Sequence, residues 1–147
     1  MHQIIVKNLI ASIQRYLDQH PAGIVVPGSG VIFTDFSGVI PDIVFISNER
    51  RDEIASGERI TSAPNLVIEI VSPGPENDRR DRIVKRQLYG KYGVKEYWIV
   101  DPESRTVETY LSEGQALKPA SVFGEQDDLT SSVRPGYSCK VESVFSL

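Results

Sequence analysis

The 147-residue sequence is short of several residue types, and each shortage excludes a class of site or of protein. Cys139 is its one cysteine, so the chain can form neither an internal disulfide nor a zinc site built from cysteines. His2 and His20 are its two histidines, and neither has a partner pattern that assigns it to chemistry. No run approaches the ~20 apolar residues of a membrane span, and the N-terminal residues lack the pattern of a signal peptide. These absences predict a cytoplasmic protein without a membrane segment.

Basic residues are also outnumbered, with 16 lysines and arginines against 20 acids and a net charge of -4. Broad, non-specific binding to nucleic acid favours a basic domain, so this balance argues against it while leaving room for a local basic groove. Apolar residues are present in the usual amount, at 40%. A chain of this length and composition is expected to fold as a single domain, residues 1–147, with a substantial core.

Hydrophobic periodicity predicts the elements of the first half of the chain. Ile5, Leu9 and Ile13 recur at helical spacing and predict a helix over residues 3–19 that ends before His20. The segments expected after it are two short β segments around a turn at 27–30, a strand at 41–47, and a polar loop with a short helix at 49–63.

The sequence of the second half of the chain predicts a helix with strands before and after it. A strand at 65–71 is followed by a helix at 77–92, which Asn77 or Asp78 caps and Gly93 ends. The segments "KEYWIV" and "RTVETYLS" are predicted strands joined by the turn "DPES", and residues 115–147 add one or two edge strands and a tail. The order α-β-β-β-α-β-β predicts an α/β fold with a mixed central sheet flanked by helices.

A carboxylate interrupts the apolar strand at 65–71, whose sequence is "NLVIEIV". Glu69 shares a face with Val67 and Val71, and both faces are apolar, as in a strand that is covered on both sides. A buried, unpaired carboxylate is costly, because desolvation raises its pKa until the group stays neutral. We therefore expect a cation near Glu69, or an opening to water at the end of the strand.

Two residues elsewhere in the chain are candidate neighbours of Glu69. Lys85 shares a helical stripe with Leu88 and Tyr92, so it is expected to face the sheet and to reach Glu69. Asp42 begins a strand that is expected to lie beside Glu69, where two carboxylates repel each other. A divalent ion resolves such repulsion, and carboxylate oxygens with water suit Mg²⁺ or Mn²⁺. Two acids, a lysine and a metal ion form a set that can hydrolyse a phosphoester.

Four ordered segments give residues 39–110 a family resemblance: "VIPDIVFIS", "APNLVIEIVSPG", "DRIVKRQLYGKYGVKEYWIVDP" and "RTVETY". The set resembles the PD-(D/E)XK nuclease superfamily, and more closely a group of small bacterial-type domains labelled restriction endonuclease-like. The resemblance implies a restriction endonuclease-like fold, with helices on both sides of a central mixed sheet, and Mg²⁺-dependent cleavage of a phosphodiester in DNA. It matches the first acid of the superfamily to Asp42 and the second acid to Glu69.

The sequence departs from the superfamily pattern at two places. The superfamily carries its lysine two residues after the second acid, where this chain has Val71. In the more similar group the lysine is shifted to the following helix, which matches Lys85. Family members also carry a further N-terminal stretch with an acidic residue, of which His2 is the expected remnant. The resemblance further implies that the backbone carbonyl of Ile70 ligates the metal ion together with the two acids.

Two functions stay open at this point, together with a third class, hydrolysis of another phosphoester, which shares the metal chemistry of the first and is not separated from it by the sequence. In the first, the chain is a Mg²⁺-dependent endonuclease whose catalytic residues are Asp42, Glu69 and Lys85. In the second, it is a catalytically inactive module of the same fold that binds nucleic acid or mediates protein contacts. Cleavage of both DNA strands needs two sites, so a homodimer is compatible with the first function.

A locally basic stretch of the predicted helix includes Arg79, Arg82 and Arg86. The stretch is either an edge that follows DNA phosphates or the solvated, charged face of a helix. We treat the three arginines as weak candidates for contact with nucleic acid.

Overall fold

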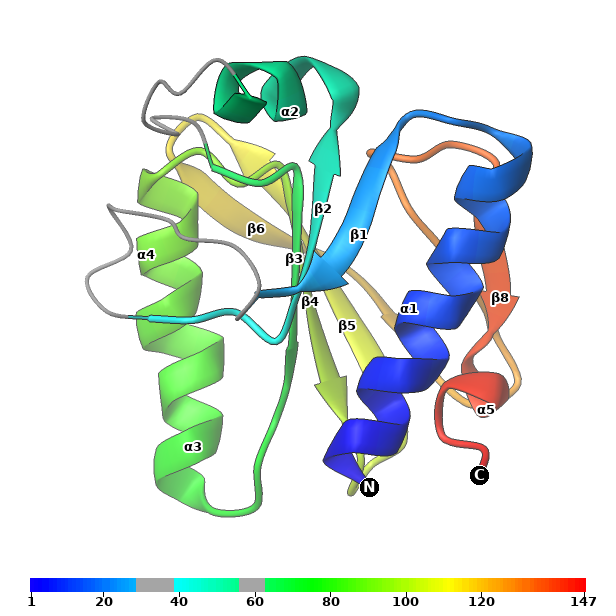
Figure 1. The fold of residues 1–147 in the computed structure, drawn as a ribbon. Helices are drawn as coiled ribbons and strands as arrows, with labels where there is room; N and C mark the ends of the chain where they lie inside the picture. Colours follow the sequence, from blue (N-terminus) through cyan, green and yellow to red (C-terminus); the bar gives the residue numbers. More distant parts are fainter. Residues whose placement is uncertain (29–38, 56–62) are drawn as a thin grey trace.

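A computed structural model describes residues 1–28, 39–55 and 63–147 of the chain. Helices cover both faces of a six-stranded sheet with the strand order β1-β2-β3-β4-β5-β6 (Figure 1). Strands β3 and β4 are parallel, and the other neighbouring pairs are antiparallel. The predicted α/β fold with a mixed central sheet is therefore confirmed. Within the described ranges, no helix is long and apolar enough to cross a membrane.

Helix α1 (His2–Gln19) covers one face of the sheet, which confirms the helix predicted at 3–19. Its buried stripe consists of Ile5, Leu9, Ile13 and Leu17. The stripe packs on alternate residues of the strands, such as Ile68 and Trp98, because side chains of a strand alternate between its two faces. The helix ends at Gln19, because Pro21 cannot continue a helix, and the first strand begins at Gly23.

Strands β1 (Gly23–Pro27), β2 (Ile43–Ser47) and β3 (Leu66–Ile70) form the first half of the sheet. Strand β2 lies antiparallel between the other two, with Ile43 opposite Ile68, so the residue before β2 lies next to the end of β3. Helix α2 (Asn48–Ala55) follows β2 and is the short helix expected within 49–63. The β segment expected after the turn at 27–30, and residues 56–62, lie outside the described residues.

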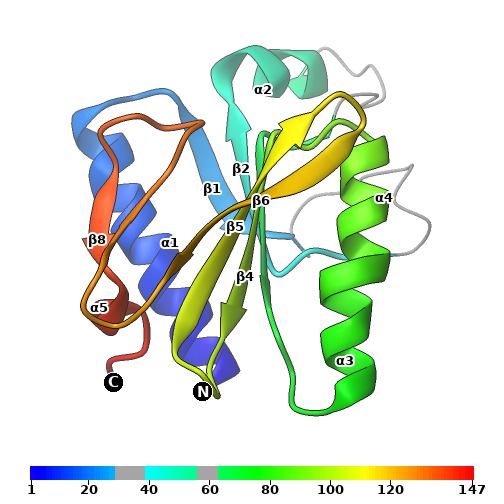
Figure 2. The same ribbon diagram turned by 180° about the vertical axis from the view of Figure 1, so that it is seen from behind.

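One continuous helical connection joins β3 to its parallel neighbour β4 (Glu96–Asp101) and covers the second face of the sheet (Figures 1 and 2). It consists of α3 (Pro75–Arg79), a π-helical segment η2 (Arg80–Lys85) and α4 (Arg86–Lys91). Tyr89 of α4 is buried in this layer, together with Tyr97 and Val67 of the sheet. A helix was expected here, but a break in its regularity was not.

The start of this connection differs from the prediction that Asn77 or Asp78 caps it. The N-cap is Gly74, and Pro75 occupies the first helical position. Gly74 has a φ of 117°, which glycine adopts without strain, and a proline in the first turn loses no helical hydrogen bond. Asn77 lies inside the helix, and its side-chain amide donates to the carbonyl oxygen of Pro73 at 2.8 Å.

Strands β5 (Thr106–Glu113) and β6 (Ala116–Phe123) complete the sheet as an antiparallel hairpin. The prediction of a tail after the edge strands is wrong. Strands β7 (Asp128–Thr130) and β8 (Ser138–Lys140) pair in a second, small sheet, and the short helix α5 (Val141–Val144) follows. This C-terminal segment packs beside α1 (Figure 2), where its apolar residues join the core below that helix.

The C-terminal segment is tied to β4 through two buried residues. Trp98, the one tryptophan of the chain, is fully buried and donates its Nε1 hydrogen to Glu96 Oε2 at 2.9 Å. Glu96, which is also buried, accepts hydrogen bonds at Oε1 from Ser131 Oγ at 2.7 Å and from the backbone nitrogen of Val133 at 3.2 Å. Tyr137 packs against Trp98 with 6.2 Å between ring centroids.

Candidate functional site

The two candidate acids lie side by side where β2 begins and β3 ends. The backbone nitrogen of Asp42 donates to Glu69 Oε1 at 2.8 Å. In return, the backbone nitrogen of Ile70 donates to Asp42 Oδ2 at 2.8 Å. These two reciprocal hydrogen bonds continue the β2–β3 ladder with side-chain acceptors, so the position of each carboxylate is set by the backbone of the other strand.

Lys85 supplies the cation that Glu69 requires. Its Nζ lies 2.6 Å from Glu69 Oε2 and 3.1 Å from Asp81 Oδ1, so the ammonium group bridges two buried carboxylates. The hydroxyl of Tyr89 donates to the same Oε2 at 3.0 Å. The contact between Lys85 and Glu69 that the sequence predicted is present, and two further side chains complete it.

The residues that the helical connection contributes to the cluster are spaced four apart: Lys85 and Tyr89 contact Glu69, and Asp81 contacts Lys85. A π-helix has i→i+5 hydrogen bonds and turns the chain through a smaller angle per residue than an α-helix. Side chains four residues apart in η2 therefore stay closer to one line along the helix. The hydroxyl of Tyr97 supports this turn from the sheet by donating to the carbonyl oxygen of Asp81 at 3.0 Å.

Burial dominates the electrostatics of this cluster. It raises the pKa of Glu69 from its ordinary 4.5 to about 7; Lys85 opposes the shift, and Asp42 adds to it. Burial also raises the pKa of Asp81, again against the effect of Lys85. Burial alone would lower the pKa of Lys85, but Glu69 and Asp81 more than offset it and raise that pKa. Lys85 is therefore held as a cation between two carboxylates.

His2 is a site neighbour that the sequence did not assign. Its Nε2 lies 3.2 Å from Asp42 Oδ1, across 40 positions of the chain. The contact follows from the packing of α1 on the sheet, which brings the first turn of the helix to the start of β2. The imidazole is 41% exposed and Asp42 is 25% exposed, so this side of the cluster faces solvent. Glu69, at 1%, does not.

The donor set can be compared with what Mg²⁺ or Mn²⁺ requires. Mg²⁺ binds through one or two carboxylates and keeps several waters, and each carboxylate oxygen can accept more than one contact. Asp42 and Glu69 supply two adjacent carboxylates, and the backbone nitrogen of Ile70 donates to Asp42. In the described part of the chain no three histidine, cysteine or acidic side chains form a metal-binding group. The chemistry of the two adjacent carboxylates, Asp42 and Glu69, fits a Mg²⁺ ion that keeps several waters, and ligation by the Ile70 carbonyl stays a prediction.

The three arginines considered for nucleic acid contact have different environments. Arg82 Nη2 lies 2.9 Å from Glu108 Oε1, and Arg86 Nε donates to the carbonyl oxygen of Leu117 at 2.8 Å. These internal contacts favour a structural role for both side chains. Arg79 is exposed at the end of α3, and its contact with phosphate stays a prediction.

Sequence reasoning missed three residues of this cluster, and two of them carried a signal. Asp81 and Tyr89 each lie four residues from Lys85, the spacing at which helical side chains become neighbours. The signal was therefore present once Lys85 was placed toward the sheet. His2 had no local signal, because its contact with Asp42 depends on how α1 packs.

Comparisons with known proteins agree with this architecture. A model of the Uma2 family, described as "Putative restriction endonuclease", matches residues 1–142. A solved structure described as "a putative nuclease belonging to DUF820 from Anabaena variabilis ATCC 29413" has the same fold, with a TM-score of 0.67 and 21% identity over 98% of this chain and 79% of that one. No curated protein matches the chain. Because the family model covers nearly its whole length, the chain belongs to the Uma2 family and, through it, to the PD-(D/E)XK superfamily.

Proposed function

We propose that the protein is a Mg²⁺- or Mn²⁺-dependent nuclease that hydrolyses phosphodiester bonds in DNA. One observation carries the proposal. Lys85 Nζ lies 2.6 Å from Glu69 Oε2, while the other oxygen of Glu69 accepts a hydrogen bond from the backbone of Asp42. Two acids and a lysine thus meet at the edge where β2 begins and β3 ends. Membership of the Uma2 family supports the same conclusion.

Each residue of the cluster has a role in this proposal. Asp42 and Glu69 hold the metal ion together with the carbonyl oxygen of Ile70. When bound, such an ion supplies positive charge to a phosphoryl oxygen and lowers the pKa of bound water. Lys85 donates a hydrogen bond to the attacking water, or to a phosphate oxygen on which negative charge develops. Asp81 keeps the ammonium group of Lys85 in place.

A cleavage assay tests the proposal. Supercoiled plasmid, linear duplex and single-stranded DNA are incubated with the protein in MgCl₂, MnCl₂ or EDTA. Cleavage is expected with the metals and not with EDTA, and Asp42→Asn, Glu69→Gln and Lys85→Ala are each expected to slow it by about 100-fold or more. The matched controls are Lys95→Ala and Glu76→Gln, which change exposed residues of the same charge. Equal cleavage by the wild type, Asp42→Asn and Glu69→Gln would contradict the assignment.

One observation favours the second function, an inactive module of the same fold. The polar atoms of Glu69 already contact Lys85, Tyr89 and the Asp42 backbone, and the side chain is almost fully buried. A closed network of this kind also suits a purely structural role. Calorimetric titration with MnCl₂ separates the two functions. Binding of Mn²⁺ that Asp42→Asn abolishes supports the nuclease, whereas no binding and no cleavage support the module.

A further inference from the structure

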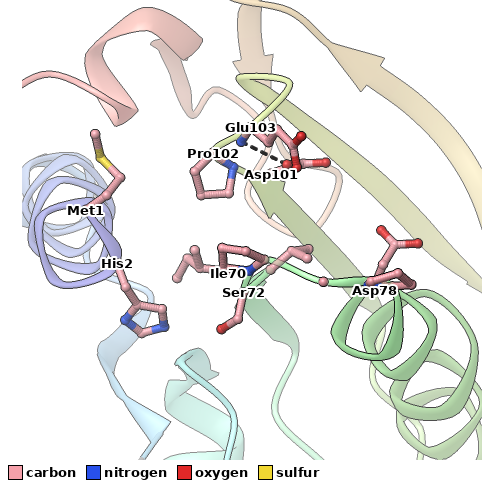
Figure 3. Close-up of a pocket in the computed structure, with 12 residues that line it drawn as sticks. Met1, His2, Ile70, Ser72, Asp78, Asp101, Pro102 and Glu103 are labelled. Carbon is pink, nitrogen blue, oxygen red and sulfur yellow. Dashed lines mark hydrogen bonds between the residues drawn. The ribbon is translucent and has the colours of Figure 1, made fainter.

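A cavity of about 450 Å³ lies next to the candidate site, beyond the end of β3 (Figure 3). Met1 and His2 at the start of α1 form one side of it, Asp78 of α3 lies on the opposite side, and the turn at 101–103 faces Ile70 and Ser72 (Figure 3). His2 and Ile70 are also the two residues that contact the carboxylate of Asp42. Asp42 does not itself line the cavity, but two residues of the lining hold its carboxylate, so the cavity adjoins this candidate metal ligand.

The walls of the cavity are largely apolar. The apolar side chains that line it are Met1, Ile70, Val71, Pro73, Pro75 and Pro102. Proline rings and aliphatic side chains offer flat, weakly hydrated surfaces against which a planar group can pack. The volume falls within the ≈300–1,000 Å³ that is usual for small-molecule pockets, so the cavity can hold a group of nucleoside size.

The charged side chains that line the cavity are acidic. Asp78, Asp101 and Glu103 all contribute to its wall. Arg82 pairs with Asp78 and, at 3.4 Å, with Asp101, but it contacts them from outside the lining. A phosphate inside the cavity would be repelled by this excess of negative charge. A neutral group with N–H donors would instead find carboxylate oxygens, although Asp101 Oδ1 already accepts a hydrogen bond from the backbone nitrogen of Glu103 at 3.0 Å.

We propose that the cavity binds one unpaired base of the substrate strand, next to the scissile phosphodiester, and prefers bases with an exocyclic amino group. The inference rests on the proposed nuclease function, which places the phosphodiester at Asp42 and Glu69. From there the neighbouring base can reach the cavity past His2, while the acidic wall excludes the backbone itself. Carboxylates accept hydrogen bonds from the amino group of cytosine, as aspartate and glutamate do in DNA grooves.

The inference narrows the class of substrate. A base can enter a pocket of this size only when it has left its stack and its pair. Nucleic acid at this position is therefore single-stranded or carries a flipped base, and cytosine or adenine is favoured over thymine. A strand that stays fully paired on both sides of the scissile bond is expected to be a poor substrate.

Binding of nucleosides tests the cavity without any need for cleavage. Deoxycytidine, deoxyadenosine, thymidine and deoxycytidine 5′-monophosphate are titrated into ¹⁵N-labelled, metal-free protein. The first two are expected to shift the backbone amide signals of Ser72, Gly74 and Glu103. Thymidine is expected to bind about tenfold more weakly, the effect of losing one hydrogen bond to a charged acceptor, and the monophosphate no more tightly than its nucleoside.

A matched pair of variants locates the binding. Ser72→Phe places a large side chain at the exposed floor of the cavity and is expected to abolish the shifts. Ser121→Phe makes the same change at an exposed position of β6, away from the cavity, and is expected to leave them intact. Absence of nucleoside binding, equal binding of thymidine, tighter binding of the monophosphate or binding unaffected by Ser72→Phe would each overturn the inference.

Single strands with one abasic position separate this inference from the nuclease proposal. Loss of the base next to the cleaved bond is expected to lower kcat/KM for cleavage at that bond by about tenfold or more. Unchanged cleavage would refute the cavity while the nuclease stands. Nucleoside binding by a protein that cuts no DNA would refute the nuclease and leave the cavity as a base-binding site.

Discussion

Lys85 is held between two carboxylates, and the more distant one, Asp81, gives the first prediction at the scale of a single residue. Asp81 acts through Lys85, so it is a positioning residue. Asp81→Asn is expected to lower kcat by about tenfold or more with little change in KM, because it loosens a hydrogen bond between two charged groups. Steady-state kinetics on a cleaved DNA substrate measure this split.

A signal that is independent of activity completes the test of Asp81. The Nζ protons of Lys85 are expected to exchange slowly enough to be observed by ¹⁵N NMR in the wild type and to be lost in Asp81→Asn. Glu76→Gln, an exposed change on the same helical connection, is the control and should preserve both the signal and kcat. A KM effect alone, with the Lys85 signal intact, would refute the positioning role.

Glu69 gives a second prediction, which concerns how the free energy of unfolding depends on pH when EDTA keeps the protein free of metal. Its pKa is raised to about 7 in the folded protein, so the folded state binds this proton more tightly than the unfolded chain. The contribution of Glu69 to stability is therefore complete below pH 4.5 and is lost as the pH rises through about 7. The decline in the free energy of unfolding has a limiting slope of about 1.4 kcal/mol per pH unit for one proton.

Urea unfolding between pH 4.5 and 8 measures this dependence. Glu69→Gln cannot ionise and is expected to reduce the decline to the part that the raised pKa of Asp81 contributes, whereas the exposed change Glu76→Gln should keep the full decline. A wild-type protein whose stability rises with pH in this window, in parallel with Glu69→Gln, would show that Glu69 has no raised pKa.

Single residues also show how far sequence reasoning reaches. Alternation along a strand placed Glu69 in the interior, and helical spacing turned Lys85 toward it, because both periodicities are local properties of the backbone. The contact of Asp42 with Glu69 needed one further step, the pairing of two strands, which the family resemblance supported. The contact of His2 lay beyond such reasoning, since His2 and Asp42 are 40 positions apart and meet only through the packing of α1 on the sheet.

At the scale of secondary-structure elements, β4 and the C-terminal segment are joined by Glu96, which gives a third prediction. Glu96→Ala leaves the buried hydrogen-bond donors of Trp98 and Ser131 without their acceptor. Each buried donor left unsatisfied costs about 1–3 kcal/mol, so a loss of several kcal/mol in the free energy of unfolding is expected. Urea denaturation measures it, and Glu113→Ala, an exposed change at the end of β5, is the control. Equal stability of the two variants would contradict this role.

The elements that sequence analysis missed have three separate causes. A stripe calculated at ~100° per residue assumes a regular α-helix, so the π-helical turns of η2 could not emerge from it. The helix begins earlier than Asn77 and Asp78 suggested. Gly74 at the N-cap and Pro75 at the first helical position start it without a side-chain cap, so polar residues do not mark its start. The strands β7 and β8 have three residues each, too few for a periodic pattern.

The whole molecule depends on its C-terminal segment, which gives a fourth prediction. The apolar residues that this segment contributes to the core under α1 are Leu129, Tyr137, Val141, Val144 and Phe145. Asn8 of α1 also donates its amide hydrogens to the carbonyl oxygens of Val144 at 3.0 Å and Ser146 at 2.6 Å. Removal of residues 125–147 is therefore expected to expose the apolar stripe of α1 and to abolish cooperative unfolding.

Thermal unfolding followed by far- and near-ultraviolet circular dichroism checks this expectation. The control is removal of Leu147 alone, which is 95% exposed and should change the free energy of unfolding by no more than about 0.5 kcal/mol. A cooperative transition with native near-ultraviolet dichroism in the chain shortened at residue 124 would show that the segment is dispensable.

The burial of Trp98 gives the protein a single intrinsic fluorophore of its kind, placed where several structural units meet. Its indole is shielded from water and donates a hydrogen bond to Glu96. Emission at short wavelength is therefore expected from the folded state, and a shift to longer wavelength indicates that water has reached the indole. Since Glu96 also binds Ser131, detachment of the C-terminal segment changes the emission even while the central sheet persists. The emission wavelength of Trp98 can thus distinguish local release of the C-terminal segment from global unfolding, without an added label.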